Sequence, residues 1–146
     1  MKIIIDVFGA ASIGKTSSIK AAYAKLSGKD FTELQGDDIY ETIHISGKLI
    51  GFASEGDPNS DQKENIKSLI DNGCDVIVCA SRTKGETSRF VEEIANDNDY
   101  LLLKMSPITN IGWLEIWGDE QIVINQLIEI NGESIANLIN KLIPIV

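Results

Sequence analysis

The chain has 146 residues, of which 43% are hydrophobic and 24% are charged, a composition that fits one ordinary globular domain. Its formal net charge of −9 at pH 7 argues against a nucleic-acid partner, because phosphate backbones bind basic surfaces. No apolar run reaches membrane-spanning length, and charge interrupts the N-terminus too early for a signal peptide. We therefore expect a cytoplasmic protein that acts on a small molecule and does not contact a membrane.

The first predicted element is a buried strand over residues 2–8, an apolar β-branched run. Residues 9–16 follow it as G-A-A-S-I-G-K-T, which matches the phosphate-binding P-loop pattern G-x-x-x-x-G-K-[ST] at every fixed position. In such a loop, backbone N–H groups surround a nucleotide phosphate, and the helix that begins there directs its positive dipole end at the anion. The expected nucleotide contacts are Gly9, Ala10, Ala11, Ser12, Ile13, Gly14, Lys15, Thr16 and Ser17.

Two side chains of the P-loop have specific expected roles. Lys15 would place its charge on the β- and γ-phosphates, and the hydroxyl of Thr16 would ligate Mg²⁺. The segment therefore predicts that the protein binds a nucleoside triphosphate, ATP or GTP, together with Mg²⁺.

Helical and strand periods alternate along the rest of the chain. The expected elements are a helix over residues 15–26, a short strand over 31–35, a β-hairpin over 42–53, a helix from 59 or 60 to 72, a strand over 75–80, a helix over 86–96, a strand over 100–105, a last strand over 121–125 and a final helix over 133–142.

Residues 120–129 allow two interpretations, a helix or a strand. The short β-branched run at residues 121–125 favours the strand. Strands that alternate with helices predict an α/β fold in which helices cover both faces of a mostly parallel sheet. We expect a three-layer sandwich with about five strands plus the hairpin, formed as a single P-loop nucleotide-binding domain over residues 1–146.

This order of elements resembles the P-loop kinases, a group within the P-loop NTPase superfamily that phosphorylates small molecules, nucleotides and polynucleotides. The specific part of the resemblance is the glycine-rich loop. In addition, residues 65–82 are similar to the helix that leads into the Walker-B-like strand of these kinases. Residues 86–107 and 121–142 are similar to their later helices and strands.

The resemblance implies that Asp37 or Asp38, after the second predicted strand, binds or deprotonates the phosphoryl acceptor. Family members usually place arginines in a lid after the fourth strand, but residues 106–118 contain no Arg or Lys. The cations that could substitute for a lid are Arg82, Lys84 and Arg89. The resulting catalytic candidates are Lys15, Asp38 and Arg82.

Three acidic residues need separate consideration. A Mg²⁺ site requires a carboxylate beside Thr16, and we assign Asp57, after the hairpin, with Asp38 as the other candidate. Asp6 stands inside the first predicted strand, where a buried carboxylate must find a partner or take up a proton. We expect Asp6 at a sheet edge or in a capped position, outside the site.

The preferred functional prediction is an ATP- and Mg²⁺-dependent, kinase-like phosphotransferase that acts on a small acceptor. One alternative is a switch-type, GTPase-like NTPase, since the hairpin and residues 54–57 resemble a switch loop, although the guanine-reading N-K-x-D motif is missing. The other alternative is a non-catalytic nucleotide-binding module.

Overall fold

The computed structural model describes residues 1–9, 14–34, 38–107 and 120–146. Its elements are β1 (Lys2–Phe8), α1 (Lys15–Ser27), β2 (Tyr40–Ile45), β3 (Lys48–Ala53), α2 (Gln62–Asp71), β4 (Val76–Ser81), α3 (Glu86–Asp97), β5 (Tyr100–Met105) and α4 (Glu120–Leu142), with short 3₁₀ helices η1 (Phe31–Glu33) and η2 (Ile143–Ile145).

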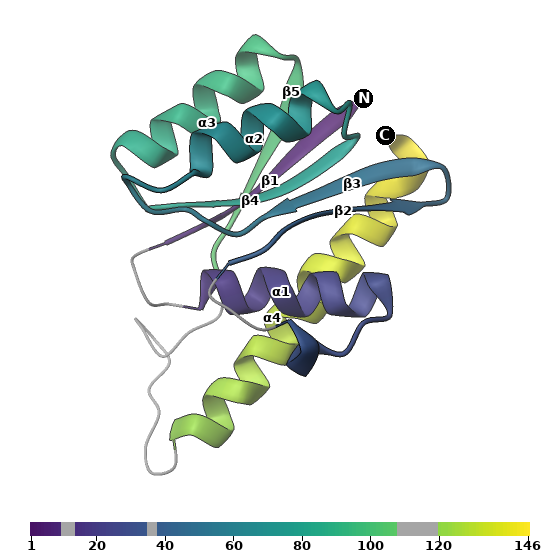
Figure 1. Ribbon diagram of the computed structural model, residues 1–146, viewed down its shortest axis with the longest axis vertical. Helices are drawn as coiled ribbons and strands as arrows, with labels where there is room; N and C mark the ends of the chain where they lie inside the picture. The colour runs from purple at the N-terminus through teal and green to yellow at the C-terminus, as the bar shows by residue number, and fades with distance from the viewer. Residues whose placement is uncertain (10–13, 35–37, 108–119) are drawn as a thin grey trace.

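The central sheet of the described residues has five strands in the order β2-β3-β4-β1-β5. β1 pairs in parallel with β4 and β5, β3 pairs in parallel with β4, and β2 alone is antiparallel to its neighbour β3. Helices α2 and α3 cover one face of the sheet, and α1 and α4 cover the other (Figure 1). The predicted fold class, an α/β three-layer sandwich with a mostly parallel sheet, is confirmed.

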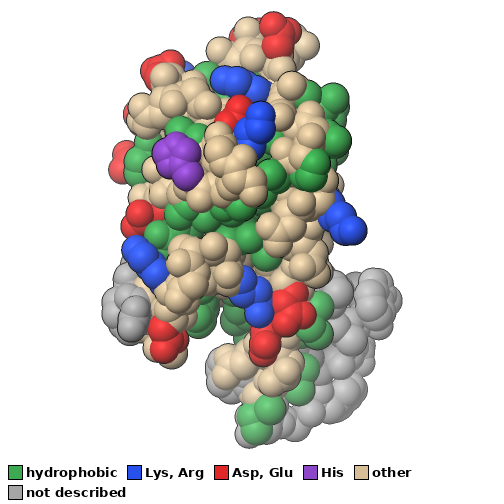
Figure 2. Space-filling view, turned by 90° about the vertical axis from the view of Figure 1, so that its right-hand side faces the viewer, with side chains coloured by type: hydrophobic (Ala, Val, Ile, Leu, Met, Phe, Trp, Pro, Cys, Tyr) green, Lys and Arg blue, Asp and Glu red, His purple; other side chains and the backbone are tan. Residues whose placement is uncertain are grey.

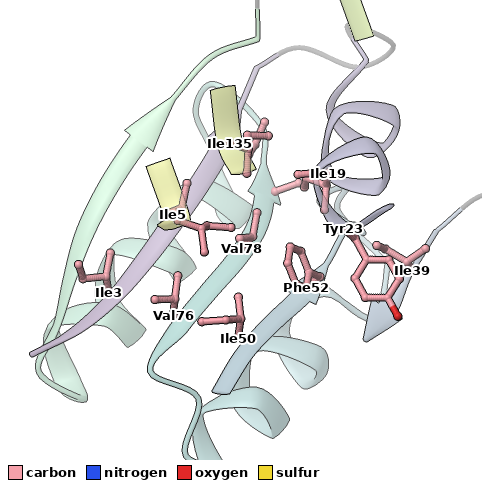
Figure 3. Close-up of a cluster of buried hydrophobic side chains, with 14 of the residues drawn as sticks. Ile3, Ile5, Ile19, Tyr23, Ile39, Ile50, Phe52, Val76, Val78 and Ile135 are labelled. Atoms are coloured by element: carbon pink, nitrogen blue, oxygen red, sulfur yellow. The ribbon is translucent and has the colours of Figure 1, made fainter. Parts of the chain in front are cut away.

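The inner strands have apolar side chains on both faces because a helical layer covers each face. Alternate residues of β1 point to opposite sides, so Ile3 and Ile5 pack toward α1 and α4 while Ile4 packs toward α2 and α3. Figure 3 shows the first of these clusters, in which Ile135 of α4 and Tyr23 of α1 close over the sheet. This core fixes the carboxyl ends of β1 and β4 beside the start of α1.

The predicted hairpin is confirmed, with β2 beginning slightly earlier than expected. Ser46 (φ 52°) and Gly47 (φ 80°) form its two-residue turn, and both have the positive φ that a type I′ turn requires. Ile45 pairs with Lys48 directly across this turn. The exposure of β2 alternates along the strand, as expected for an edge strand with one solvated face.

Two predicted strands are wrong. In place of the strand over residues 31–35, Phe31–Glu33 forms η1, which Asp30 caps by accepting hydrogen bonds from the N–H and the hydroxyl of Thr32. The run over residues 121–125 belongs to α4. Ile122 and Val123 are exposed, so packing of the run itself does not decide its conformation. Farther along, α4 crosses α1 so closely that a Cβ on Gly132 would lie 2.5 Å from Ala21 Cβ, and a helix fixed there extends through the run at one hydrogen bond per added residue.

The start of α2 also differs from the prediction. The helix begins at Gln62 and not at residue 59 or 60, and the Nε2 of Gln62 donates to Ala80 O at 2.8 Å. This bond ties the first turn of α2 to the carboxyl end of β4. Within the ranges that the structure describes, no helix has both the length and the hydropathy to cross a membrane.

Candidate functional site

Gly9 and Gly14 hold the two ends of the glycine-rich segment at the carboxyl edge of the sheet. The Gly9 N–H donates to Ser81 O of β4 at 3.1 Å. Gly14 precedes α1 with φ 88° and ψ 21°, a left-handed conformation that glycine adopts without strain. Helix α1 therefore begins directly after this glycine. Four predicted phosphate contacts in that segment lie outside the described residues: Ala10, Ala11, Ser12 and Ile13.

Lys15, the first residue of α1, is buried with 7% of its surface exposed. Its Nζ donates to Gly9 O at 2.7 Å and to Ser81 O at 3.0 Å, so the ammonium bridges the ends of β1 and β4. Burial lowers the pKa of Lys15, the nearby charge of Asp57 opposes this effect, and that of Arg82 adds to it. Neutral carbonyl oxygens solvate this ammonium, and a phosphate would give it a stronger, charge-assisted partner.

The carboxylate of Asp38 lies beside Thr16. Thr16 Oγ1 donates to Asp38 Oδ1 at 3.2 Å, and Ser54 Oγ donates to the same oxygen at 2.9 Å. Ser54 follows β3 and Asp38 shortly precedes β2, so the hairpin brings both residues to the start of α1. Of the two carboxylates proposed for the neighbourhood of Thr16, the structure brings Asp38 into contact with it. Asp37 lies outside the described residues.

Thr16 and Asp38 together present the hard oxygen donors that Mg²⁺ prefers. Their two oxygens are 3.2 Å apart, close to the separation of about 2.9 Å between neighbouring ligands of an octahedral ion bound at about 2.0–2.1 Å. Among the described residues, no three or more His, Cys, Asp or Glu side chains gather as a metal-binding group. A bound Mg²⁺ would therefore take its remaining ligands from phosphate oxygens and water, as is usual for this ion.

Asp57, the predicted metal ligand, instead pairs with Arg82. Arg82 Nε lies 2.8 Å from Asp57 Oδ1, and both side chains are partly exposed. Close packing places their loops side by side, since a Cβ on Gly56 would lie 2.7–2.8 Å from Ala80. The structure thus gathers Asp57, Arg82 and Lys15 at one edge of the sheet, and it places Asp38 rather than Asp57 at Thr16.

Asp6 lies beneath this edge, and its predicted sheet-edge position is wrong. It belongs to β1, between β4 and β5, and is fully buried. Ser81 Oγ donates to Asp6 Oδ2 at 2.7 Å, and Lys104 Nζ lies 4.0 Å from the same oxygen. Burial raises the pKa of Asp6 to about 6, although the Ser81 hydrogen bond and Lys104 act in the opposite direction.

Sequence reasoning missed three serine and glutamine side chains around the site. Ser54 bonds Asp38, Ser81 joins Asp6 to Lys15 through its hydroxyl and carbonyl, and Gln62 anchors α2 on β4. The available signal for Ser54 and Ser81 was their position, because each follows or ends a predicted buried strand where polar residues meet at the ligand-binding edge. Their partners, far away in sequence, gave no local signal.

On the face shown in Figure 2, acidic and basic side chains are scattered among apolar ones, and neither sign of charge forms a continuous patch. The histidine on that face, His44, is exposed on β2. A separate groove of about 590 Å³ is lined by α1, η1 and α4, including Ala24, Phe31 and Ile128, and lies away from the strand ends.

Comparisons with family models, with curated proteins and with solved structures find no match to this chain. The functional interpretation therefore depends on the residues and geometry described above.

Proposed function

We propose that this protein is a member of the P-loop NTPase superfamily, related to the small P-loop kinases, that binds ATP with Mg²⁺ at the carboxyl edge of β1. The observation that carries the proposal is the position of Lys15, a buried ammonium that bridges Gly9 O and Ser81 O at the first turn of α1. A helix N-terminus and a fixed positive charge at one point form a site for an anion. The sequence pattern specifies a polyphosphate as that anion.

The proposed metal site consists of Thr16 and Asp38. Bound Mg²⁺ would neutralise charge on the phosphate oxygens. We favour Asp38 over Asp57 as the acidic ligand because Asp38 contacts the Thr16 hydroxyl, whereas Asp57 forms an ion pair with Arg82.

The proposed reaction is transfer of a phosphoryl group to a small acceptor. Lys15 and Arg82 supply positive charge to the transferring group, which is the principal catalytic requirement of this chemistry. Arg82 contacts Asp57 through Nε, and a guanidinium has five N–H donors, so Arg82 can keep this contact while its Nη groups donate to a phosphate. Arg82→Ala is therefore expected to reduce transfer about 10-fold or more while ATP affinity changes less.

One observation supports the switch-type alternative. Ser54 begins the loop after β3 and bonds Asp38, so a change at the metal site would reach residues 54–57 directly. If ATP is hydrolysed without an acceptor, and if hydrogen exchange in this loop then depends on the nucleotide state, the switch-type function is the better description.

Isothermal titration calorimetry with ATP and GTP, in the presence and absence of Mg²⁺, tests the binding proposal. Lys15→Ala is expected to weaken ATP binding by about 10- to 100-fold, because it removes a charge-assisted contact. Lys25→Ala is the matched control, since Lys25 lies on the same helix but pairs with Glu133 of α4. Absence of binding at millimolar nucleotide, or equal binding by wild type and Lys15→Ala, would contradict the proposal.

A further inference from the structure

We infer that Ser54 is a positioning residue of the Mg²⁺ site, which holds the Asp38 carboxylate against Thr16. The inference deepens the proposed function and depends on it. The observation that carries it is that one oxygen atom, Asp38 Oδ1, accepts hydrogen bonds from both Thr16 and Ser54.

Ser54 is a buried polar residue at the end of an apolar strand. Only 1% of its surface is exposed, and the two preceding residues, Phe52 and Ala53, are fully buried. A hydroxyl in such a position destabilises the fold unless hydrogen bonds satisfy it. The Ser54 hydroxyl meets this requirement by donating to the Asp38 carboxylate at the proposed site. The bond that stabilises the buried hydroxyl therefore also fixes the position of Asp38.

The hydrogen bonds of Ser54 fix its direction. Its Oγ accepts from the Ile39 N–H at 2.8 Å while it donates to Asp38, and its own N–H donates to Ile39 O at 3.1 Å. With the Ile39 N–H occupying a lone pair of the hydroxyl, the remaining hydrogen points at Asp38 Oδ1. Ser54 is thus tied to the backbone beside Asp38 and cannot turn away from it without breaking these bonds.

Asp38 needs such support because its side chain is exposed. An exposed carboxylate samples several rotamers in water, and a metal must select the one that faces Thr16. Ser54 holds Asp38 in that rotamer before the ion arrives, so less conformational freedom is lost on binding. The expected consequence is a lower Mg²⁺ requirement, with no change in the contacts that the nucleotide makes without metal.

The test measures ATP affinity by calorimetry over a series of free Mg²⁺ concentrations and in excess EDTA. In Ser54→Ala we expect the half-maximal Mg²⁺ concentration to rise about 10-fold, while affinity in EDTA stays within about 2-fold of wild type. Ser54→Cys, a near-isosteric variant with a weak S–H donor, is expected to show the same direction. It serves as the second variant where Ser54→Ala does not fold, and thermal unfolding establishes which variants are folded.

Two further variants separate positioning from a general structural role. Ser88→Ala is the matched control, because Ser88 is also buried and hydrogen-bonded, to Lys104 on the other face of the sheet. It is expected to leave the Mg²⁺ requirement unchanged. Because Ser54 acts through Asp38, the double variant Ser54→Ala, Asp38→Asn should require no more Mg²⁺ than Asp38→Asn alone.

The outcomes distinguish the inference from the function on which it depends. If wild type binds ATP with Mg²⁺ and Ser54→Ala has an unchanged Mg²⁺ requirement, or if the effects of the Ser54 and Asp38 variants add, the positioning role is overturned and the proposed function stands. If wild type binds no nucleotide under any condition, both are overturned.

Discussion

Two serine hydroxyls each bond a carboxylate near the glycine-rich segment, but the two pairs lie in different surroundings. Ser54 Oγ donates to Asp38 at 2.9 Å, and Asp38 is exposed. Ser81 Oγ donates to Asp6 at 2.7 Å, and Asp6 is fully buried inside β1. The same local chemistry thus gives one carboxylate that a hydrated cation can reach and one that it cannot reach.

Each pair touches a different residue at the start of α1. Asp38 contacts the Thr16 hydroxyl, whereas Ser81, the partner of Asp6, accepts a hydrogen bond from Lys15 through its carbonyl oxygen. Position in the fold, rather than residue type, therefore separates the two carboxylates: Asp38 is a candidate metal ligand, and Asp6 is a buried group that affects stability. Substitutions that affect one pair and not the other test this distinction.

The largest expected effect is on the pH dependence of stability. Burial raises the pKa of Asp6 from 3.8 to about 6, although the Ser81 hydrogen bond and the charges of Lys104 and Lys15 lower it, and the charge of Glu92 of α3 raises it further. Cys79 of β4 also faces the carboxylate, with Sγ 4.0 Å from Oδ1. The folded state therefore holds the proton of Asp6 more tightly than the unfolded state does. The associated stability is fully present below about pH 4 and is lost as the pH rises to about 6.

Asp6→Asn removes this titration. At pH 8 the Asn variant is expected to be more stable than wild type, by an amount on the order of 3 kcal/mol, and the two should converge near pH 4. Urea unfolding at several pH values between 4 and 8 measures the difference. Parallel stability curves for wild type and Asp6→Asn would show that the buried pair has no such effect.

The next effect concerns metal binding, for which a substitution of Asp38 is expected to have a larger effect than a substitution of Asp6. Asp38→Asn is expected to raise the Mg²⁺ concentration needed for half-maximal ATP binding on the order of 30-fold, because an ionised ligand becomes a neutral one. Asp6→Asn should change the same quantity by less than about 3-fold, because Asp6 is inaccessible to the ion. Calorimetric titrations of both variants make the comparison, and an equal response would remove the distinction between the pairs.

These two pairs also mark the limit of what the sequence predicted. β1, β4 and β5 follow from continuous apolar runs, and the roles of residues 9–17 were predicted from a local pattern. Contacts between residues distant in sequence were not predictable in this way. The choice between Asp38 and Asp57 depends on which carboxylate contacts the Thr16 hydroxyl, and Asp38 does so from 22 residues away in sequence.

The other errors have the same physical origin. Asp6 was expected at a sheet edge or in a capped position. The sheet edge was wrong because the strand order, which puts β1 between β4 and β5, is a property of the whole fold and not of the strand's own residues. Residues 121–125 have a local preference for strand, but they form the start of the 23-residue helix α4, which packs on α1 farther along, at Gly132. Local patterns thus predicted a candidate phosphate-binding segment, and tertiary packing decided which acidic side chains lie beside it.

The smallest expected effect is that of a substitution at Gly56, which connects the Ser54–Asp38 pair to the Ser81–Asp6 pair. This residue lies between Ser54 and Asp57 and packs on Ala80, next to Ser81, at a distance that leaves no room for a side chain. Because the loop is partly exposed and can shift, Gly56→Ala should reduce stability by roughly 1–2 kcal/mol. The shift would draw Ser54 away from Asp38, so the Mg²⁺ requirement should rise by about 3-fold, less than in Ser54→Ala. Lys141→Ala, at an exposed position in the last turn of α4, is the control and should change neither quantity. If Gly56→Ala lowers the urea midpoint and leaves the Mg²⁺ requirement unchanged, the loop supports the fold without transmitting its position to the metal site, and the two serine pairs are independent.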